Sequence, residues 1–448
     1  MIKPQTLRGF RDLLPPAAAL REAVTAHAKE VFRSYGIGPI DTPALEYAEI
    51  LLGKGGDETD KQTFRFTDQG GRDVAMRFDL TVPFARFAAQ HVGALGTPFK
   101  RYHIAPVWRG ERPQKGRYRE FVQCDFDTIG ATGVAADAET VCVIHDLVSR
   151  ISRQVEPSCG EFTIRLNHRG VLNGLLDTLG LRERATDVLR TLDKLPKVGA
   201  DAVRAELIAL PEAGEEAAAK LLEFAVLSGD AAETFAAARP LLGGSEMGLA
   251  ALDRLATVVQ LAVDGGCEPS RLVADLSIAR GLDYYTGVIF ETFLTDDPKL
   301  GSVCSGGRYD DLAGLYTKQS LPGVGASLGV DRLLAHLEEK AGDAGARPND
   351  PRAVFVPLLS EERLPEVFAL ANDLRTAGFL VTVAPETRGL GKHLKWVTGR
   401  GFGVAAIIGD DEAAASTVTF KDLAEREQWT VARAKAAERL SEWRSEKT

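Results

Sequence analysis

The sequence predicts an α+β protein: an antiparallel β-sheet flanked by helices, with a helical insertion and a separate C-terminal α/β domain. Three observations predict this fold class. Up to residue 336, short strand-like stretches are interspersed with helices, without the βαβ alternation of a Rossmann fold. Residues 171–266 are rich in Ala, Leu and Glu at helical spacing. From residue 352 to 448, strands and helices alternate cleanly.

The first part of the chain supplies the expected sheet. A helix over 16–35 begins after Pro-Pro and stops at Gly36, and 64–78 forms a hairpin around Gln69-Gly-Gly. The later expected strands are 101–108, 121–129, 272–278 and 288–293, followed by a strand-to-helix passage at 323–334. We therefore predict a domain over 1–336 that is interrupted by the helical insertion at about 171–266.

The second part begins after a stretch rich in Gly, Asp, Pro and Asn. Its composition predicts a linker at 337–351 before a domain at 352–448. The expected strands there are 353–358, 379–383, 404–409, 417–420 and 428–432, and the expected helices are 361–377, 390–398 and 434–443.

The composition excludes several classes of protein. The chain has 45% apolar and 26% charged residues, the balance of a soluble globular protein, and no run of about 18 apolar residues suggests a membrane span. The first five residues, Met-Ile-Lys-Pro-Gln, do not resemble an export signal. Five scattered cysteines and seven histidines show no metal-ligand spacing, and the net charge of −9 argues against indiscriminate nucleic-acid binding. We expect a cytoplasmic protein without a protein-held metal site.

The densest chemical signal is the stretch Arg109-Gly-Glu-Arg-Pro-Gln-Lys-Gly-Arg-Tyr-Arg-Glu-Phe121, which holds five cations within eleven residues. Guanidinium groups bind phosphate oxygens bidentately, although a solvated hairpin tip would show the same charge. In the strand that follows, Gln123, Asp125 and Asp127 share one face, with the first and last ~13 Å apart. A polar face beside a cationic hairpin suits a zwitterion and a polyphosphate.

Three further clusters stand out. They are Ala279-Arg-Gly-Leu-Asp-Tyr-Tyr-Thr-Gly287, Cys304-Ser-Gly-Gly-Arg-Tyr-Asp-Asp-Leu312 and Gly323-Val-Gly-Ala-Ser-Leu-Gly-Val-Asp-Arg332. The first is equally compatible with aromatic packing at a strand end, and the glycines of the second permit close backbone approach. The third glycine of the last cluster comes one residue too late for a dinucleotide fingerprint.

Together these clusters resemble the class II aminoacyl-tRNA synthetases and, within them, the histidyl-tRNA synthetases. The segment 109–127 is similar to motif 2, 323–334 to motif 3, and the helix ending near Tyr35 with Pro43 to motif 1. Arg280-Gly-Leu-Asp-Tyr-Tyr and Ser305-Gly-Gly-Arg-Tyr-Asp resemble the two signatures peculiar to the histidine enzymes. The resemblance covers nearly the whole chain and is weakest in the helical insertion.

The resemblance implies a role for each matching residue. For ATP, the set is Arg109 at the α-phosphate, Glu111 at the adenine edge, Phe121 and Arg332 on the two faces of the adenine ring, and Arg117 and Arg280. For histidine, the set is Asp79, Leu80, Thr81, Arg109, Gln123 and Asp127 around the α-amino group and nearby polar atoms, with Tyr284, Tyr285 and Tyr309 at the imidazole. Arg280 and Arg109 are the implied catalytic cations. The chain has Arg-Phe-Asp-Leu-Thr where some members have Arg-Pro-Glu-Gly-Thr, so the shorter Asp79 stands in place of a glutamate at the ammonium.

The implied activity is that of a histidine–tRNA ligase. Such an enzyme activates L-histidine with ATP to histidyl-adenylate, releases pyrophosphate, and transfers histidine to the 3′ end of tRNA(His). Arginines and Mg²⁺ would offset the repulsion between carboxylate and α-phosphate. The resemblance also implies a homodimer and an anticodon-binding C-terminal domain, in which Arg388, Lys392, Lys395 and Arg400 either face tRNA or form a solvated helix face.

Three alternatives were weighed. A histidine-binding regulatory subunit of ATP phosphoribosyltransferase shares this core, but such chains generally have degenerate motifs and no C-terminal α/β domain. A class II synthetase for threonine, proline or glycine would need another pocket in place of the three tyrosines. A pure RNA-binding protein does not explain Arg280 beside a complete motif 2.

Overall fold

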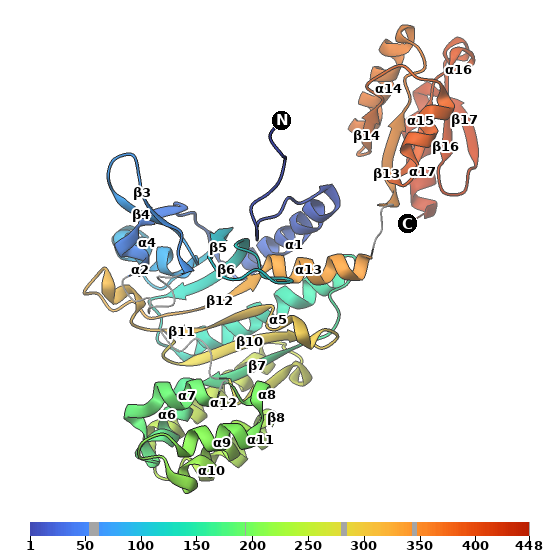
Figure 1. Ribbon diagram of the computed structural model, residues 1–448. Helices are drawn as coiled ribbons and strands as arrows, with labels where there is room; N and C mark the ends of the chain where they lie inside the picture. Colours follow the sequence, from blue (N-terminus) through green and yellow to red (C-terminus); the bar gives the residue numbers. More distant parts are fainter. Residues whose placement is uncertain (53–61, 193, 279–284, 343–346, 448) are drawn as a thin grey trace. The chain divides into compact units, whose positions relative to one another are not determined.

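The computed structural model describes residues 1–52, 62–192, 194–278, 285–342 and 347–447. They form two compact units, Met1–Lys340 and Ala341–Thr448, each with its own hydrophobic core (Figure 1). Within these residues, no helix is long and apolar enough to span a bilayer.

The first unit is built on a nine-stranded sheet (Figure 1). Its strands, in spatial order, are β1 (Gly38–Pro39), β5 (Phe99–Trp108), β6 (Glu120–Ile129), β12 (Gly323–Gly329), β11 (Cys304–Tyr309), β10 (Val288–Leu294), β7 (Phe162–His168), β9 (Leu272–Asp275) and β8 (Ser228–Gly229). In this spatial order, every neighbouring pair from β5 through β6, β12, β11 and β10 to β7 is antiparallel. The pairs β1–β5 and β7–β9, toward the two edges, are parallel. The expected antiparallel α+β architecture is confirmed.

The two faces of this sheet differ sharply in chemistry, because successive side chains of a strand alternate between them. One face is apolar and packs against helices α1 (Pro15–Ser34) and α5 (Val134–Gln154). The apolar residues include Tyr102, Cys124, Phe126, Leu328 and Phe290. The residues that alternate with these along the strands, among them His103, Asp125 and Ser327, lie on the opposite face. This second face carries the candidate site.

The remaining elements of the first unit extend the sheet on two sides. Strands β2 (Leu45–Tyr47), β4 (Asp73–Met76) and β3 (Arg65–Thr67) form a small sheet beside α2 (Ala48–Leu52) and α4 (Thr81–Leu95). The antiparallel pairing of β3 with β4 confirms the expected hairpin. The helix after motif 3 is α13 (Val330–Ala341), so the predicted linker at 337–351 overlaps a helix at one end and β13 at the other.

The chain between β7 and β9 is helical. Its α-helices are α6 (Arg169–Thr178), α7 (Ala185–Leu192), α8 (Leu195–Val198), α9 (Ala200–Ile208), α10 (Gly214–Ala225), α11 (Ala231–Leu241) and α12 (Glu246–Asp264). Gly174 and Gly248 allow α6 and α12 to pack backbone against backbone, since a Cβ on Gly174 would lie 2.3 Å from the Cα of Gly248. The two-residue strand β8 from this segment pairs with β9 at the edge of the large sheet.

Two strand expectations in the first unit needed correction. The strand expected over 272–278 ends at Asp275, because Ser277 turns back and donates from its backbone N and Oγ to the Asp275 carboxylate. The segment 304–309, for which the sequence predicted no strand, is the central strand β11. A Cβ on Gly306 would lie 2.1 Å from the carbonyl oxygen of Gly325, so close packing between β11 and β12 requires glycine there.

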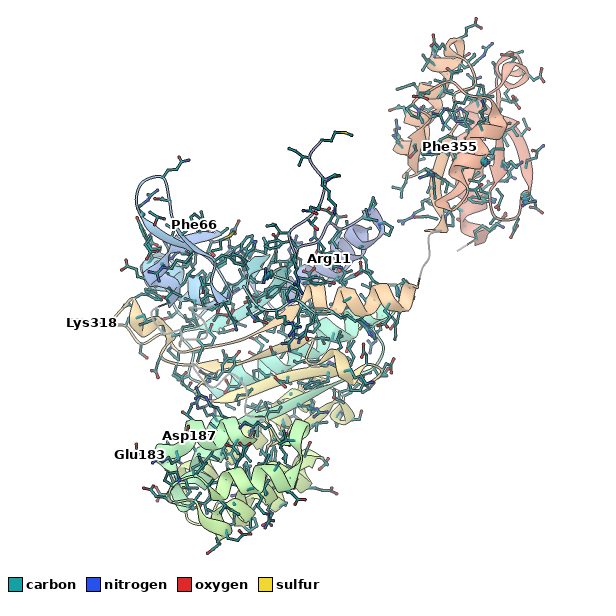
Figure 2. All side chains as sticks on the ribbon, in the orientation of Figure 1. Arg11, Phe66, Glu183, Asp187, Lys318 and Phe355 are labelled. Carbon is teal, nitrogen blue, oxygen red and sulfur yellow. The ribbon has the colours of Figure 1, made fainter. Side chains whose placement is uncertain are left out.

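The second unit is a five-stranded sheet with helices. Its strand order is β14 (Leu380–Val383), β13 (Arg347–Val356), β15 (Arg400–Ile407), β16 (Thr417–Asp422) and β17 (Gln428–Ala432). The helices are α14 (Leu364–Thr376), α15 (Leu390–Val397), α16 (Asp410–Ala415) and α17 (Ala436–Lys447). Phe355 of β13 is fully buried within this unit (Figure 2), where its ring contacts His393, Trp396 and Phe402.

Candidate active site

The cationic segment is a hairpin between β5 and β6. Its two strands pair from Phe99 opposite Ile129 to Trp108 opposite Glu120, and Arg109 N donates to the carbonyl oxygen of Arg119. The tip closes through reciprocal backbone hydrogen bonds between Gln114 and Arg117, with Gly116 at a positive φ of 68°. Glycine adopts this backbone conformation without the steric cost of a Cβ.

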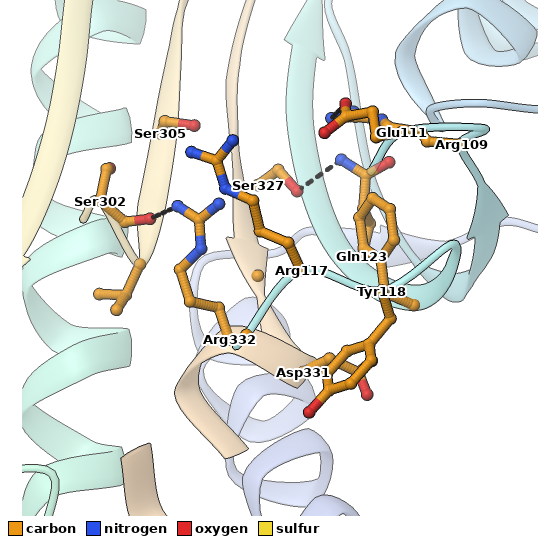
Figure 3. A pocket seen from close by; sticks show the side chains of 14 residues that line it. Arg109, Glu111, Arg117, Tyr118, Gln123, Ser302, Ser305, Ser327, Asp331 and Arg332 are labelled. Atoms are coloured by element: carbon orange, nitrogen blue, oxygen red, sulfur yellow. Dashed lines mark hydrogen bonds and ion pairs between the residues drawn. The ribbon is translucent and has the colours of Figure 1, made fainter. Parts of the chain in front are cut away.

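A pocket of about 230 Å³ lies between this hairpin, the polar face of the sheet and the start of α13 (Figure 3). The charged and aromatic residues of its lining are Arg109, Glu111, Arg117, Tyr118, Phe121, Asp331 and Arg332, and the small polar ones include Gln123, Ser302, Ser305 and Ser327. The pocket therefore collects arginines from two motifs that are more than 200 residues apart.

The whole described ATP set lies in this pocket. Arg109 donates from Nε to the carbonyl oxygen of Phe78 at 3.0 Å, and its guanidinium carbon lies 5.2 Å from the centre of the Phe121 ring. Glu111 faces Arg109 at 4.0 Å. Arg332 donates to the carbonyl oxygen of Ser302, and its side chain and that of Arg117 both extend into the pocket (Figure 3).

Asp331 is a part of the pocket that sequence reasoning missed. One of its carboxylate oxygens accepts from Val122 N at 2.6 Å, and the other accepts from Arg11 at 3.2 Å. Arg11 also bonds Glu338 on α13 and lies over the Tyr118 ring. Asp331 thus joins motif 3 to motif 2, and Arg11 holds the N-terminal segment against both.

The histidine set continues along the polar face of β6. Gln123 Nε2 donates to Ser327 Oγ at 3.0 Å (Figure 3), while its Oε1 is buried and has no hydrogen-bond partner in the described part of the chain. Deeper in the sheet, the Tyr309 hydroxyl donates to Asp127 Oδ1 at 2.6 Å. Gly325 leaves room for this carboxylate, because a Cβ there would lie 2.3 Å from Asp127 Oδ1.

The turn before α4 approaches the same carboxylate. Asp79 is buried and caps α4 by accepting from Val82 N at 3.1 Å. Burial raises its pKa to about 6, and the nearby Arg109 and Arg101 partly offset that effect. The Leu80 side chain is buried against Ala105, Val107 and Phe121, so this residue offers the site its carbonyl oxygen. Thr81 is the first residue of α4.

Among the three expected tyrosines, Tyr309 and Tyr285 fall in the described chain. Tyr285 packs against Gly307, where a Cβ would lie 2.9 Å from Tyr285 Cδ1, and both tyrosines belong to one apolar cluster. Arg280 and Tyr284 lie outside the described residues.

Sequence reasoning overlooked Arg101, a fully buried residue of β5 whose Nη2 lies 2.6 Å from Asp127 Oδ2. It also treated Asp125 only as part of a polar face, although burial raises the pKa of this carboxylate to about 7. The alternation of β5 could have placed Arg101 opposite Asp127, but only with the strand register known.

The described residues contain no group of three or more His, Cys, Asp and Glu side chains able to hold a metal ion. Two carboxylates, Glu111 and Asp331, line the pocket, and both oxygens of Asp331 are already engaged. Mg²⁺ is commonly held by one or two carboxylates together with substrate phosphates and water. The pocket fits that mode, with Glu111 as the available protein carboxylate.

Comparison with known proteins identifies the family. The family model for histidyl-tRNA synthetase matches residues 9–333, and a model for an anticodon binding domain matches residues 353–443. A histidine–tRNA ligase of Rhodopirellula baltica is 54% identical over 432 residues, which is 96% of both chains. One from Wolinella succinogenes is 43% identical over 435 residues, 96% of this chain and 95% of the relative.

Solved structures agree. The crystal structure of histidyl-tRNA synthetase from Nostoc sp. PCC 7120 matches with a TM-score of 0.87 and 34% identity, covering 99% of this chain and 100% of that one. An ATP phosphoribosyltransferase regulatory subunit/histidyl-tRNA synthetase from Bacillus halodurans C matches with a TM-score of 0.74 at 24% identity, over 88% of this chain and 97% of that one. The second likeness bears on the fold alone. From its motifs, its fold and its relatives, the chain belongs to the histidyl-tRNA synthetase family of aminoacyl-tRNA ligases.

Proposed function

We propose that this chain activates L-histidine with ATP, releases pyrophosphate, and transfers histidine from the adenylate to the 3′ end of tRNA(His). The observation that carries the proposal is the single pocket in which the arginine-bearing hairpin meets Gln123 on the polar face of β6. That arrangement provides a cationic wall for a triphosphate next to neutral and acidic groups for an amino acid.

The ATP half of the proposal is electrostatic. Attack of the histidine carboxylate on the α-phosphate brings two anions together, and positioned cations lower the cost of this approach. Arg109 is the pocket residue assigned to the α-phosphate, held in place by the Phe78 carbonyl. Phe121 and Arg332 are assigned to the two faces of the adenine ring, and Arg117 to the phosphates. Arg280 keeps its role as the second catalytic cation on the strength of the family resemblance.

The amino-acid half uses the deeper polar groups. The buried Gln123 Oε1, which has no hydrogen-bond partner in the described part of the chain, is assigned as an acceptor for the α-ammonium group, together with Asp79 and Thr81. Tyr309, Tyr285 and Tyr284 are assigned to the imidazole ring. Asp127, which the resemblance groups with the residues near the α-amino group, is here assigned to the ring as well, because the Tyr309 hydroxyl donates to it. A pocket built to hydrogen-bond both ring nitrogens rejects analogues by ~10⁴-fold, since its own polar groups would otherwise be left unpaired.

The proposal extends to cofactor, partners and location. Mg²⁺ arrives with ATP, held mainly by phosphate oxygens and water, and stabilises charge on the phosphates, while Glu111 stays assigned to the adenine edge. The second unit binds the tRNA anticodon arm. Lys392 and Lys395 are exposed residues of its helix α15. Two chains associate as a homodimer through the motif 1 region, and the enzyme works in the cytoplasm.

Charging of tRNA tests this function. The purified chain with ATP, Mg²⁺ and radiolabelled histidine should attach label to tRNA(His) and to no other tRNA of a mixed pool. An R109A variant should charge at least ~100-fold more slowly, because it loses a donor aimed at the transition-state charge. Charging of another tRNA, or equal rates for the parent and R109A, would overturn the proposal.

A further inference from the structure

Arg101 is a buried cation that the roles described so far do not use. Its side chain is fully buried on β5, directly opposite Asp127 in the register of the β5–β6 pair. Nη2 lies 2.6 Å from Asp127 Oδ2 and 3.3 Å from the carbonyl oxygen of Leu80, while the guanidinium carbon lies 4.3 Å from the centre of the Phe84 ring. One side chain therefore joins β5, β6 and the turn that carries Asp79.

Asp127 is held from other sides as well. The Tyr309 hydroxyl on β11 donates to Oδ1 at 2.6 Å, and the backbone of Gly325 on β12 lies against the carboxylate. An ionised carboxylate has about four lone-pair sites. The Tyr309 hydroxyl engages one of them, and the Arg101 guanidinium forms an ion pair with the other oxygen, so Asp127 keeps acceptor capacity between two neighbours that hold it.

The charge around Asp127 makes its ionisation sensitive to Arg101. The titratable and charged groups that face it are Arg101 from β5, Tyr309 from β11, Asp125 from its own strand and Asp79 from the turn before α4. Burial raises the pKa of all three carboxylates; Asp127 adds to the rise at Asp125 and at Asp79, and Asp79 adds to it at Asp125. Arg101 opposes this effect at every one of the three.

We propose that Arg101 is a positioning residue for substrate selection: it keeps Asp127 ionised and oriented, so that Asp127 accepts a hydrogen bond from the N–H of a neutral imidazole ring. The inference rests on the proposed function and specifies which form of the substrate the pocket binds. Neutral imidazole has one N–H donor and one acceptor nitrogen. A protonated Asp127 would present a hydroxyl where the pocket needs an acceptor, and the ring would lose one of its two partners.

The test is the pH profile of kcat/KM for histidine in ATP–pyrophosphate exchange, measured from pH 6 to 9 for the parent, R101M and R101K. In R101M, kcat/KM for histidine should fall ~10- to 100-fold at pH 7, and part of that loss should be regained by pH 9. The reason is that the acid limb of the profile, the pH range below which kcat/KM falls, moves up by at least about one pH unit. KM for ATP should stay within ~2-fold, and R101K should recover part of the histidine selectivity. The substrate ring also titrates near pH 6.5, identically for every variant, so the difference between profiles belongs to the protein.

Two further variants separate positioning from general stability. Y309F removes the hydrogen bond that Tyr309 donates to Asp127 and should move the acid limb in the same direction by a smaller amount. R308M removes a similarly buried arginine from its ion pair with Asp137, so it should lower the melting temperature without moving the limb. If R101M does not fold, Y309F decides the matter.

An acid limb of R101M that coincides with the parent's (or of Y309F, if R101M does not fold), or equal losses toward histidine and ATP at every pH, would overturn the inference. A parent chain that exchanges pyrophosphate with histidine while this limb stays unmoved would leave the proposed function standing and remove only the role of Arg101. A parent inactive with histidine would remove both.

Discussion

Replacing Asp125 by Asn should stabilise the first unit at alkaline pH and leave it nearly unchanged at acidic pH. Asp125 is 1% exposed on β6, and its Oδ1 has no hydrogen-bond partner in the described chain. Burial raises its pKa to about 7; Arg101 and a hydrogen bond from Ser327 oppose the rise, whereas Asp127 and Asp79 add to it. The folded protein therefore holds a proton on Asp125 that the unfolded chain has already released.

The sign and size follow from that difference. The pKa of Asp125 is higher in the folded chain than its value of about 3.9 in an unfolded chain. The contribution of Asp125 to the stability of the folded first unit is therefore fully present below pH 4 and is lost as the pH rises through 7. About three pKa units at about 1.4 kcal/mol each make about 4 kcal/mol, an upper bound because the neighbouring carboxylates titrate together. For about 340 residues with an unfolding entropy of about 2 cal/mol/K each, this amounts to about 5 °C in the melting temperature.

Differential scanning calorimetry of D125N and the parent at pH 5.5 and pH 8 measures the effect on the first-unit transition. Only about 1.5 of the three pKa units lie above pH 5.5, which is about 2 kcal/mol, so the melting-temperature difference, variant minus parent, should rise by up to about 3 °C between the two pH values. D137N is the matched control: Asp137 is also buried, but Arg254 and Arg308 bond it, so D137N should destabilise at both pH values. A D125N difference that stays constant from pH 5.5 to 8 would refute the reasoning.

Three further predictions concern function. G325A should raise the histidine KM by at least ~10-fold in the exchange assay, since the new Cβ would lie 2.3 Å from Asp127 Oδ1. G314A is the control and should match the parent, because a Cβ at Gly314 would meet no atom within 4 Å. Q123A should raise the histidine KM by ~10-fold with little change for ATP, and equal effects on the two substrates would contradict its assignment. A chain ending at residue 340 should keep most adenylate formation and lose most tRNA charging, which parallel exchange and aminoacylation assays would show; equal losses would point to a role of the second unit in folding.

The parts of the site that follow from local pattern could be predicted from the sequence. Alternation along β6 put Gln123, Asp125 and Asp127 on one face, and the strand register confirms this. The cationic hairpin was recognisable because its turn and its arginines are contiguous.

The parts that depend on contacts across the sheet could not be predicted in this way. The Arg101–Asp127 pair needs the β5–β6 register, and the bond from Val122 N to Asp331 joins residues about 200 positions apart. Strand β11 was missed as a strand because adjacent glycines are unfavourable for strands, and only the approach of β12 explains them.

The most direct test of the central claim is exchange of labelled pyrophosphate into ATP, run with the purified chain and each of the twenty amino acids in turn. Histidine alone should support exchange, because Asp127 and the tyrosines deeper along the polar face are assigned to an imidazole ring. Exchange with a different amino acid, or histidine binding by calorimetry without exchange, would contradict the account; the second result would match a regulatory histidine-binding protein instead.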